Sequence, residues 1–168
     1  MANIGERASL QILHEKTPGL FLDGGELGEI LLPHREIPRG CSLGGFLDVF
    51  LYTDSEDRPV ATVFEPKAMP GQFARLKCVA VTGVGAFLDW GLPKDLLVPF
   101  REQKVRMEVG KSYIVRVEVD EHTGRIVASR RLTRYLDKEP PKFKKGQEVD
   151  LLTFAGVLSF KAMKVQNF

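Results

Sequence analysis

Hydrophobic and polar positions alternate in short runs along this chain, and glycine or charged residues separate the runs. In the second half, the runs span residues 74–81, 85–89, 96–99, 112–119 and 125–129. The clearest, at 113–119, reads YIVRVEV and has the period of two that is typical of a strand with one side in water. Residues 100–109 leave room for a single helical turn. The pattern therefore predicts an all-β fold of short strands without a long helix.

One phrase of this pattern occurs twice. The stretch FLDGGELGEILLPHRE begins at Phe21, and FLDWGLPKDLLVPFRE begins at Phe87, so that eight of sixteen positions agree at an offset of 66 residues. The same offset relates Gly5 to Gly71 and Asp54 to Asp120. Self-similarity at a fixed spacing indicates two copies of one unit. Five short strands in such a unit fit the small Greek-key barrel of the OB-fold, so we expect tandem five-stranded OB barrels.

The repeat also predicts the domain boundaries. The first barrel is expected at residues 1–66 and the second at 69–136, followed by a linker at 137–145 that contains two prolines and alternating charges. The opening of the segment 146–168 resembles the first strand of the second copy, which suggests the start of a third repeat. That segment is too short to close another barrel. Either the chain is a fragment of a longer protein, which we favour, or its tail completes something else.

Composition narrows the class of protein. The 168 residues are 43% hydrophobic and 27% charged, which is ordinary for a globular chain. No apolar run approaches the roughly 20 residues that span a bilayer, and the N-terminus does not resemble a secretory signal. Cys41 and Cys78 lie far apart and outside any metal-binding spacing, so we read them as reduced thiols. We expect a cytoplasmic protein that has no membrane partner.

Charge differs sharply between the copies. Residues 1–68 contain six Lys/Arg and eleven Asp/Glu, a net charge of −5, whereas residues 69–136 contain twelve and seven, a net charge of +5. Phosphate backbones are repelled by the first distribution and attracted by the second. The second copy is therefore the expected nucleic-acid barrel, and the first is not.

The second copy resembles the S1 RNA-binding domain. The resemblance rests on Gly71, VGAFLDW at 84–90, LLVPFR at 96–101, VRV at 115–117 and GRIVAS at 124–129. The first copy lacks the GAF phrase, so it is similar to the S1 domain only because it is similar to the second copy. Its tandem arrangement makes the chain similar to the conserved virulence factor B family, in which successive S1 domains precede a winged helix. That family implies a bacterial regulator of gene expression, with virulence traits among its targets, and the absence of a winged helix here agrees with a fragment.

The resemblance implies an RNA-binding surface in which an aromatic platform holds bases and basic side chains surround it. Phe87 stands at the family's stacking phenylalanine, and we expect it to face RNA; packing in the core is the alternative. Trp90, three residues on, points to the opposite face of a strand, so packing in the core or a turn and stacking on a base are both open for it. Val84 and Pro99 replace an aromatic residue and a histidine of the family, which reduces the platform. The basic candidates of the second copy are Lys77, Arg116, Arg125, Arg130 and Arg131.

Catalytic patterns are missing from the sequence. It contains no GxxxxGK[ST] loop, no HExxH and no serine elbow, so we expect no enzyme, no cofactor and no metal site. The acidic run Asp54–Asp57 is expected to form a polar hairpin turn. The leading hypothesis is an RNA-binding module that holds single-stranded RNA on the second barrel without chemistry. The alternative is a protein-interaction scaffold in which the acidic first barrel holds a basic protein partner.

Overall fold

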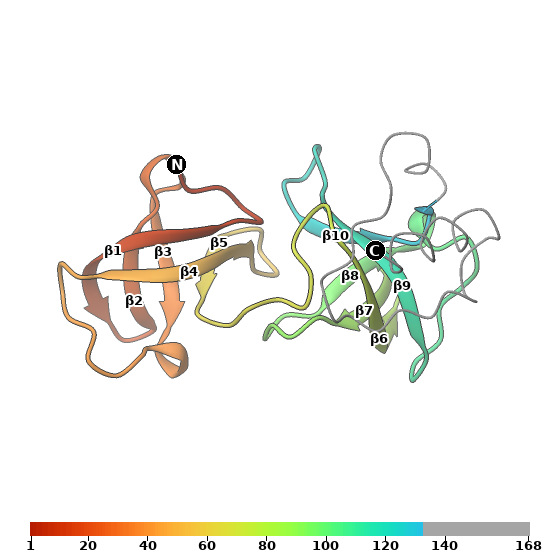
Figure 1. Cartoon of the computed structure of the whole chain (residues 1–168), viewed down its shortest axis with the longest axis horizontal. Helices are drawn as coiled ribbons and strands as arrows, with labels where there is room; N and C mark the ends of the chain where they lie inside the picture. The colour runs from red at the N-terminus through yellow and green to blue at the C-terminus, as the bar shows by residue number, and fades with distance from the viewer. Residues whose placement is uncertain (133–168) are drawn as a thin grey trace, which may run out of the picture. The chain divides into compact units, whose positions relative to one another are not determined.

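The computed structural model describes residues 1–132, which form two β-barrels (Figure 1). The first barrel consists of β1 (Arg7–Lys16), β2 (Gly19–Asp23), β3 (Glu29–Pro33), β4 (Phe46–Thr53) and β5 (Pro59–Thr62). The second consists of β6 (Phe73–Thr82), β7 (Gly85–Asp89), β8 (Leu96–Pro99), β9 (Ser112–Val119) and β10 (Ile126–Ser129). Single 3-10 turns stand at η1 (Gly25–Leu27), η2 (His34–Glu36) and η3 (Phe100–Glu102).

Both barrels close in the same strand order. The strand order around the first barrel is β1-β2-β3-β5-β4, and around the second it is β10-β8-β7-β6-β9. Read in the other direction from β6, the second order is β6-β7-β8-β10-β9, which matches the first strand for strand. In each, one parallel pair completes an otherwise antiparallel sheet, with Leu31 opposite Val60 and Leu97 opposite Val127. Tandem five-stranded OB barrels were predicted, and this fold class is confirmed. The strands of the second copy begin and end within one residue of the predicted runs.

The remaining organisation of the chain stays a prediction. The linker at 137–145 and the start of a third repeat at 146–168 lie outside the described residues, and so does the end of the second domain at 136. Within residues 1–132, no helix has the length and apolar character needed to cross a membrane.

Alternation along the strands builds the two cores. In strands such as β3 and the middle of β6, side chains at every second position are removed from water, because successive strand residues point to opposite faces, whereas the second half of β4 is buried on both faces. The fully buried residues of the first barrel include Leu22, Ile30, Leu32, Val49 and Leu51. Those of the second include Ala86, Leu88, Val98, Val115 and Val117.

A glycine opens the second strand of each barrel because no side chain fits there. Gly19 and Gly85 have φ angles of +153° and +152°. A Cβ atom would lie 2.0 Å from the Leu32 carbonyl oxygen at the first position and 2.3 Å from that of Val98 at the second. The strands β2 and β3, and likewise β7 and β8, therefore approach each other more closely than any other residue would permit.

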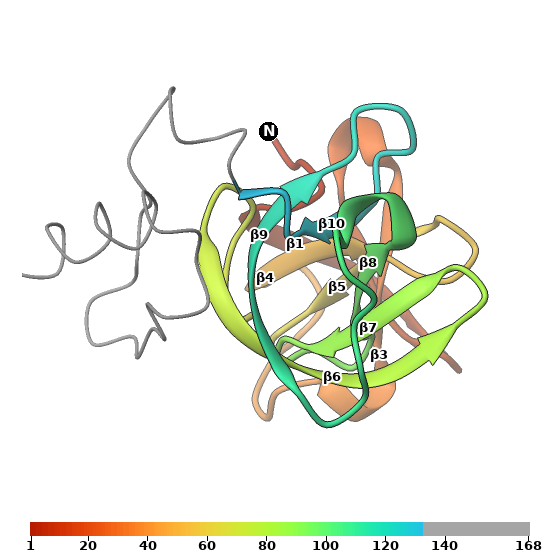
Figure 2. The same ribbon diagram turned by 90° about the vertical axis from the view of Figure 1, so that its right-hand side faces the viewer.

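A bulge interrupts the first strand of each barrel at the same place in the repeat. The pairing register shifts between Ile12 and His14 in β1 and between Cys78 and Ala80 in β6. One extra residue there changes which side chains face outward. Beyond the bulge, His14 lies directly opposite Phe21, and Ala80 opposite Phe87. Figure 2 shows β6 and β7 lying side by side in the second barrel.

Candidate nucleic-acid interface

Phe87 lies on the outer face of the second barrel. Its neighbours in β7, Ala86 and Leu88, are both 0% exposed, whereas the Phe87 side chain is only half-buried. Adjacent strand residues point to opposite faces, so the aromatic ring points away from the core. Core packing, the alternative left by the sequence, does not describe this residue. Contact between Phe87 and RNA stays a prediction.

Of the two alternatives for Trp90, the structure has the packed one. Only 2% of this residue is exposed, and its indole Nε1 donates a hydrogen bond of 2.7 Å to the Lys94 carbonyl oxygen. A buried indole N–H needs such an acceptor. The tryptophan therefore anchors the segment after β7 and takes no part in the outer aromatic surface.

The residues around Phe87 on the outer face are partly apolar and partly charged. Ala80 flanks the ring on β6 and Leu97 on β8, both directly opposite Phe87 across the sheet. Lys77 pairs in register with Asp89, two residues beyond Phe87 on the same face. It lies three residues from Ala80 along β6, a distance of about 10 Å. Lys77 is exposed and therefore available to a phosphate next to a base on Phe87.

Arg116 belongs to another part of the barrel surface. Its partner in register is Phe73, at the opposite end of β6 from Ala80, and its Cζ atom lies 5.6 Å from the centre of the Phe73 ring. Seven residues of strand separate Phe73 from Ala80, which corresponds to about 20 Å. The structure therefore does not bring Arg116 next to Phe87, although both belong to the same barrel.

Arg130 and Arg131 follow β10 and are tied to the segment after β8. The Arg130 Cζ atom lies 4.6 Å from the centre of the Tyr113 ring, and its backbone N–H donates to the Glu102 carbonyl oxygen. Burial lowers the pKa of the Arg130 guanidinium from its usual value. Arg131 Nε donates to the Arg101 carbonyl oxygen at 2.6 Å. Both arginines thus have local structural contacts besides any role toward RNA.

Arg125 lies in the turn between β9 and β10, where its backbone N–H donates to Thr123 Oγ1 at 3.2 Å. Asp120 closes this turn, since its N–H donates to the Arg125 carbonyl oxygen and its Oδ1 accepts from His122. Lys77 thus lies on the strand that pairs with the strand of Phe87, whereas the predicted arginines are spread over β9, the β9–β10 turn and the end of β10 (Arg116, Arg125, Arg130 and Arg131). An OB barrel holds roughly 4–16 nucleotides, so a single-stranded nucleic acid of that length is long enough to reach from Phe87 to these arginines.

Sequence reasoning missed an aromatic pair on the first barrel. Phe21 is the equivalent of Phe87, and the His14 ring stacks on it with centroids 4.9 Å apart and planes 19° apart. Lys16 Nζ lies 5.5 Å from the Phe21 ring centre, and Glu29 Oε2 lies 3.0 Å from His14 Nε2. The signal was available. Two-residue turns follow Lys16 and Thr82, and counting back from such a turn pairs His14 with Phe21 and Ala80 with Phe87.

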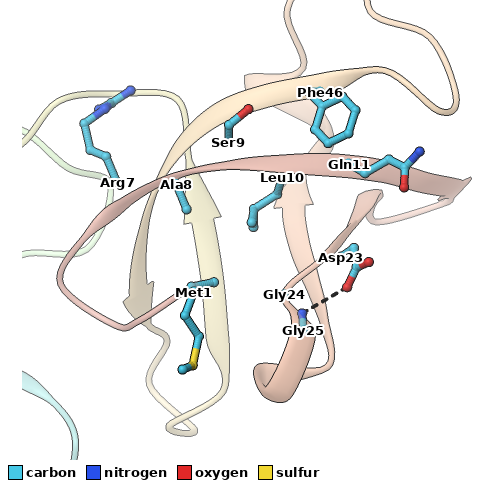
Figure 3. Close-up of a pocket in the computed structure, with 11 residues that line it drawn as sticks. Met1, Arg7, Ala8, Ser9, Leu10, Gln11, Asp23, Gly24, Gly25 and Phe46 are labelled. Carbon is cyan, nitrogen blue, oxygen red and sulfur yellow. Dashed lines mark hydrogen bonds between the residues drawn. The ribbon is translucent and has the colours of Figure 1, made fainter.

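The first barrel also has an open hollow of about 480 Å³ beside β1 (Figure 3). Met1, Arg7 and the loop glycines Gly24 and Gly25 contribute to its walls, and Phe46, 67% exposed, stands at its side. The mixture of backbone, charged and apolar groups contains no set of catalytic side chains.

Other candidate chemistry is structural in the described part of the chain. No group of three or more His, Cys, Asp or Glu side chains in residues 1–132 is arranged to hold a metal ion. Cys41 and Cys78 are free thiols. Asp54 forms the predicted hairpin turn, accepting hydrogen bonds from the backbone N–H groups of Glu56 and Arg58.

The strand order and closure of both barrels define a protein of the OB-fold class. Residues 4–63 match the family model described as the S1 domain. This match lies in the first copy, although the sequence motifs favoured the second as the more typical S1 domain. The S1 domain is thus present at the N-terminus and is not merely inferred there through the repeat.

Solved structures support the same fold. The chain is similar to the crystal structure of a multidomain protein with nucleic acid binding domains from Streptococcus pneumoniae TIGR4, with 23% sequence identity and a TM-score of 0.63. The similarity covers 88% of this chain and 53% of that one, so the present sequence spans about half of the solved protein. No curated protein matches the sequence.

Proposed function

We propose that the chain binds single-stranded RNA on the outer face of the second barrel and acts as a non-catalytic regulator of gene expression in the bacterial cytoplasm. The observation that carries this proposal is the position of Phe87, a half-buried ring on the outside of a barrel whose region has a net charge of +5. An aromatic side chain gives any base a stacking surface, and surrounding cations attract the phosphates. The S1 match and the likeness to a nucleic-acid-binding multidomain protein support nucleic acid as the ligand.

The proposed roles differ between the two groups of basic residues. Lys77 serves the nucleotide next to the stacked base, because it lies about 10 Å from Ala80 along β6. Arg116, Arg125, Arg130 and Arg131 extend the path of the backbone away from Phe87. Phosphate contacts of this kind raise affinity without reading sequence. A bacterial regulator that resembles the conserved virulence factor B family is the biological setting that we propose.

Replacing Phe87 tests this function directly. A fluorescein-labelled, uridine-rich RNA of about 12 nucleotides is titrated with the whole chain, and anisotropy gives the Kd. Phe87→Ala removes one stacked base, which contributes about 1–3 kcal/mol, so the Kd is expected to rise roughly 5- to 150-fold. The matched control is Phe21→Ala, the equivalent ring of the acidic barrel, which leaves the Kd unchanged. Equal RNA affinity of Phe87→Ala and the native chain would overturn the proposal.

The hollow on the first barrel favours a second candidate, a protein-interaction scaffold. Its region has a net charge of −5, and the exposed Phe46 offers an apolar contact beside it. A basic peptide is the chemistry that suits the net charge of this region, with Asp23 as the acidic side chain of the hollow itself. In an NMR titration with a lysine-rich peptide, this function predicts shifts of the Arg7 and Asp23 amides that Phe46→Ser abolishes. RNA binding in the anisotropy assay, with no such shifts, would rule it out.

A further inference from the structure

The two barrels differ at the residue that faces their outer phenylalanine. Position 14 of the first barrel and position 80 of the second are related by the 66-residue offset and follow the same bulge. Each lies directly opposite the phenylalanine of its barrel, Phe21 or Phe87. Opposite residues of an antiparallel pair have their Cβ atoms about 5 Å apart on one face. The first barrel has histidine there and the second has alanine.

In the first barrel this position is filled by a ring. The imidazole of His14 lies nearly parallel to Phe21, at 19°, with 4.9 Å between the ring centres. Glu29 holds the imidazole from β3 through the 3.0 Å contact with Nε2, and Lys16 approaches the same phenylalanine from β1. A nucleobase stacked on an aromatic side chain takes this offset, nearly parallel arrangement. His14 therefore occupies part of the surface that a base would use.

In the second barrel the same position is open. Ala80 carries a single methyl group, and Thr82 stands where the first barrel has Lys16. Among residues 1–132, neither an aromatic ring nor a cation is stacked on Phe87, in contrast to Phe21. The methyl group of Ala80 lies beside the Phe87 ring and is too small to stack on it. The two platforms thus share one phenylalanine position and differ in access to it.

We infer that the residue at position 14 or 80 determines which barrel accepts a base. Histidine closes the platform of the first barrel by stacking on it, and alanine leaves the platform of the second barrel open. The inference rests on the proposed function, since it explains why only one of two matched rings is available. It adds a specificity-determining residue that lies at the base position and acts by covering or exposing the phenylalanine ring.

The test exchanges the two residues in the whole chain. Ala80→His is expected to weaken binding of the labelled RNA roughly 5- to 100-fold, as the new imidazole covers Phe87. Ala80→Ser, which keeps the side chain small, is the matched control and retains native affinity. Unchanged near-ultraviolet circular dichroism of Trp90 shows that the second barrel is still folded.

The reverse exchange uses a neutral probe, so that the charge of the first barrel does not oppose binding. Adenosine is titrated at millimolar concentration into chain with isotope-labelled phenylalanine. His14→Ala is expected to make the Phe21 ring signals shift with adenosine, whereas in the native chain only the Phe87 signals shift.

The outcomes separate this inference from the proposed function. If Phe87→Ala loses RNA but Ala80→His does not, the function stands and the inference is wrong. Failure of Phe21 to respond to adenosine in His14→Ala likewise overturns it. If Phe87→Ala retains full RNA affinity, the proposed function itself is lost, and the inference is lost with it.

Discussion

At the scale of single residues, the same backbone geometry serves two purposes. Gly85 lets β7 and β8 approach closely, and Phe87, two positions on, receives its outward orientation from the strand that begins there. The orientation of Phe87 thus depends on a buried glycine two positions earlier in the same strand. The outward position of the Phe87 ring therefore depends on the close approach of the β7 and β8 backbones at Gly85.

Replacing this glycine is expected to destabilise the second barrel. In Gly85→Ala, the new Cβ meets the Val98 carbonyl oxygen at a φ of +152°, and strain of this kind costs about 1–3 kcal/mol. Urea unfolding followed by fluorescence reports on this barrel alone, because Trp90 is the single tryptophan of the chain. Gly83→Ala is the control, since nothing lies within 4 Å of its added Cβ. Coincident unfolding curves for Gly85→Ala and the native chain would contradict the steric argument.

At the scale of elements, strands were predictable and their pairing was less so. The sequence alone predicted the bounds of β9 from the alternation at 112–119, and the start of β7 from the glycine at 85. The bulge at Val79 was not visible, because an extra strand residue differs little in polarity from its neighbours. The bulge shifts the pairing of β6 with β7 beyond Ala80, whereas the turn after Thr82 already pairs Ala80 with Phe87. The separation of Arg116 from Phe87 likewise depends on the register between β6 and β9, which polarity does not encode.

The segment between η3 and β9 is held by one buried amide. Gln103 is 2% exposed; its Nε2 donates to the Val98 carbonyl oxygen at 2.9 Å, and its Oε1 accepts from the Met107 N–H at 3.1 Å. Gln103→Leu leaves these two backbone groups without their partner. A loss of about 1–3 kcal/mol is expected in Trp90-detected urea unfolding. Val105→Ser, at a site 71% exposed, is expected to change stability little. Similar midpoints for the two variants would show that the amide is dispensable.

At the scale of the whole molecule, charge is divided between regions while the fold is repeated. The first 68 residues have a net charge of −5 and residues 69–136 a net charge of +5, although both parts contain the same closed strand order. Net charge does not determine fold, but it does determine the partners that approach. This division was readable from sequence, and so was the pairing of His14 with Phe21, which follows from the two-residue turn after Lys16.

Salt dependence is expected to follow this division. For single strands, the slope of log K against log salt changes by about 0.7 for each phosphate contact. Lys77→Ala and Arg116→Ala should each reduce the slope by about that amount, whereas Arg39→Ala, an exposed cation of the acidic region, leaves it unchanged. The measurement is the Kd of the labelled RNA at several salt concentrations. Equal slopes for all three variants would show that these second-barrel cations do not contact phosphates.

The two-residue turn that pairs His14 with Phe21 and Ala80 with Phe87 places a variable residue on the outer face of a barrel whose strand order is the same in both copies. The core residues and the glycines that open β2 and β7 are constrained in both copies, because the surrounding atoms leave no room for a larger side chain. The outward partner of the phenylalanine, His14 or Ala80, is half-buried outside the core and can change by one substitution without disturbing the core. After a gene duplication, such a position lets one copy acquire a new specificity while the other keeps the old one.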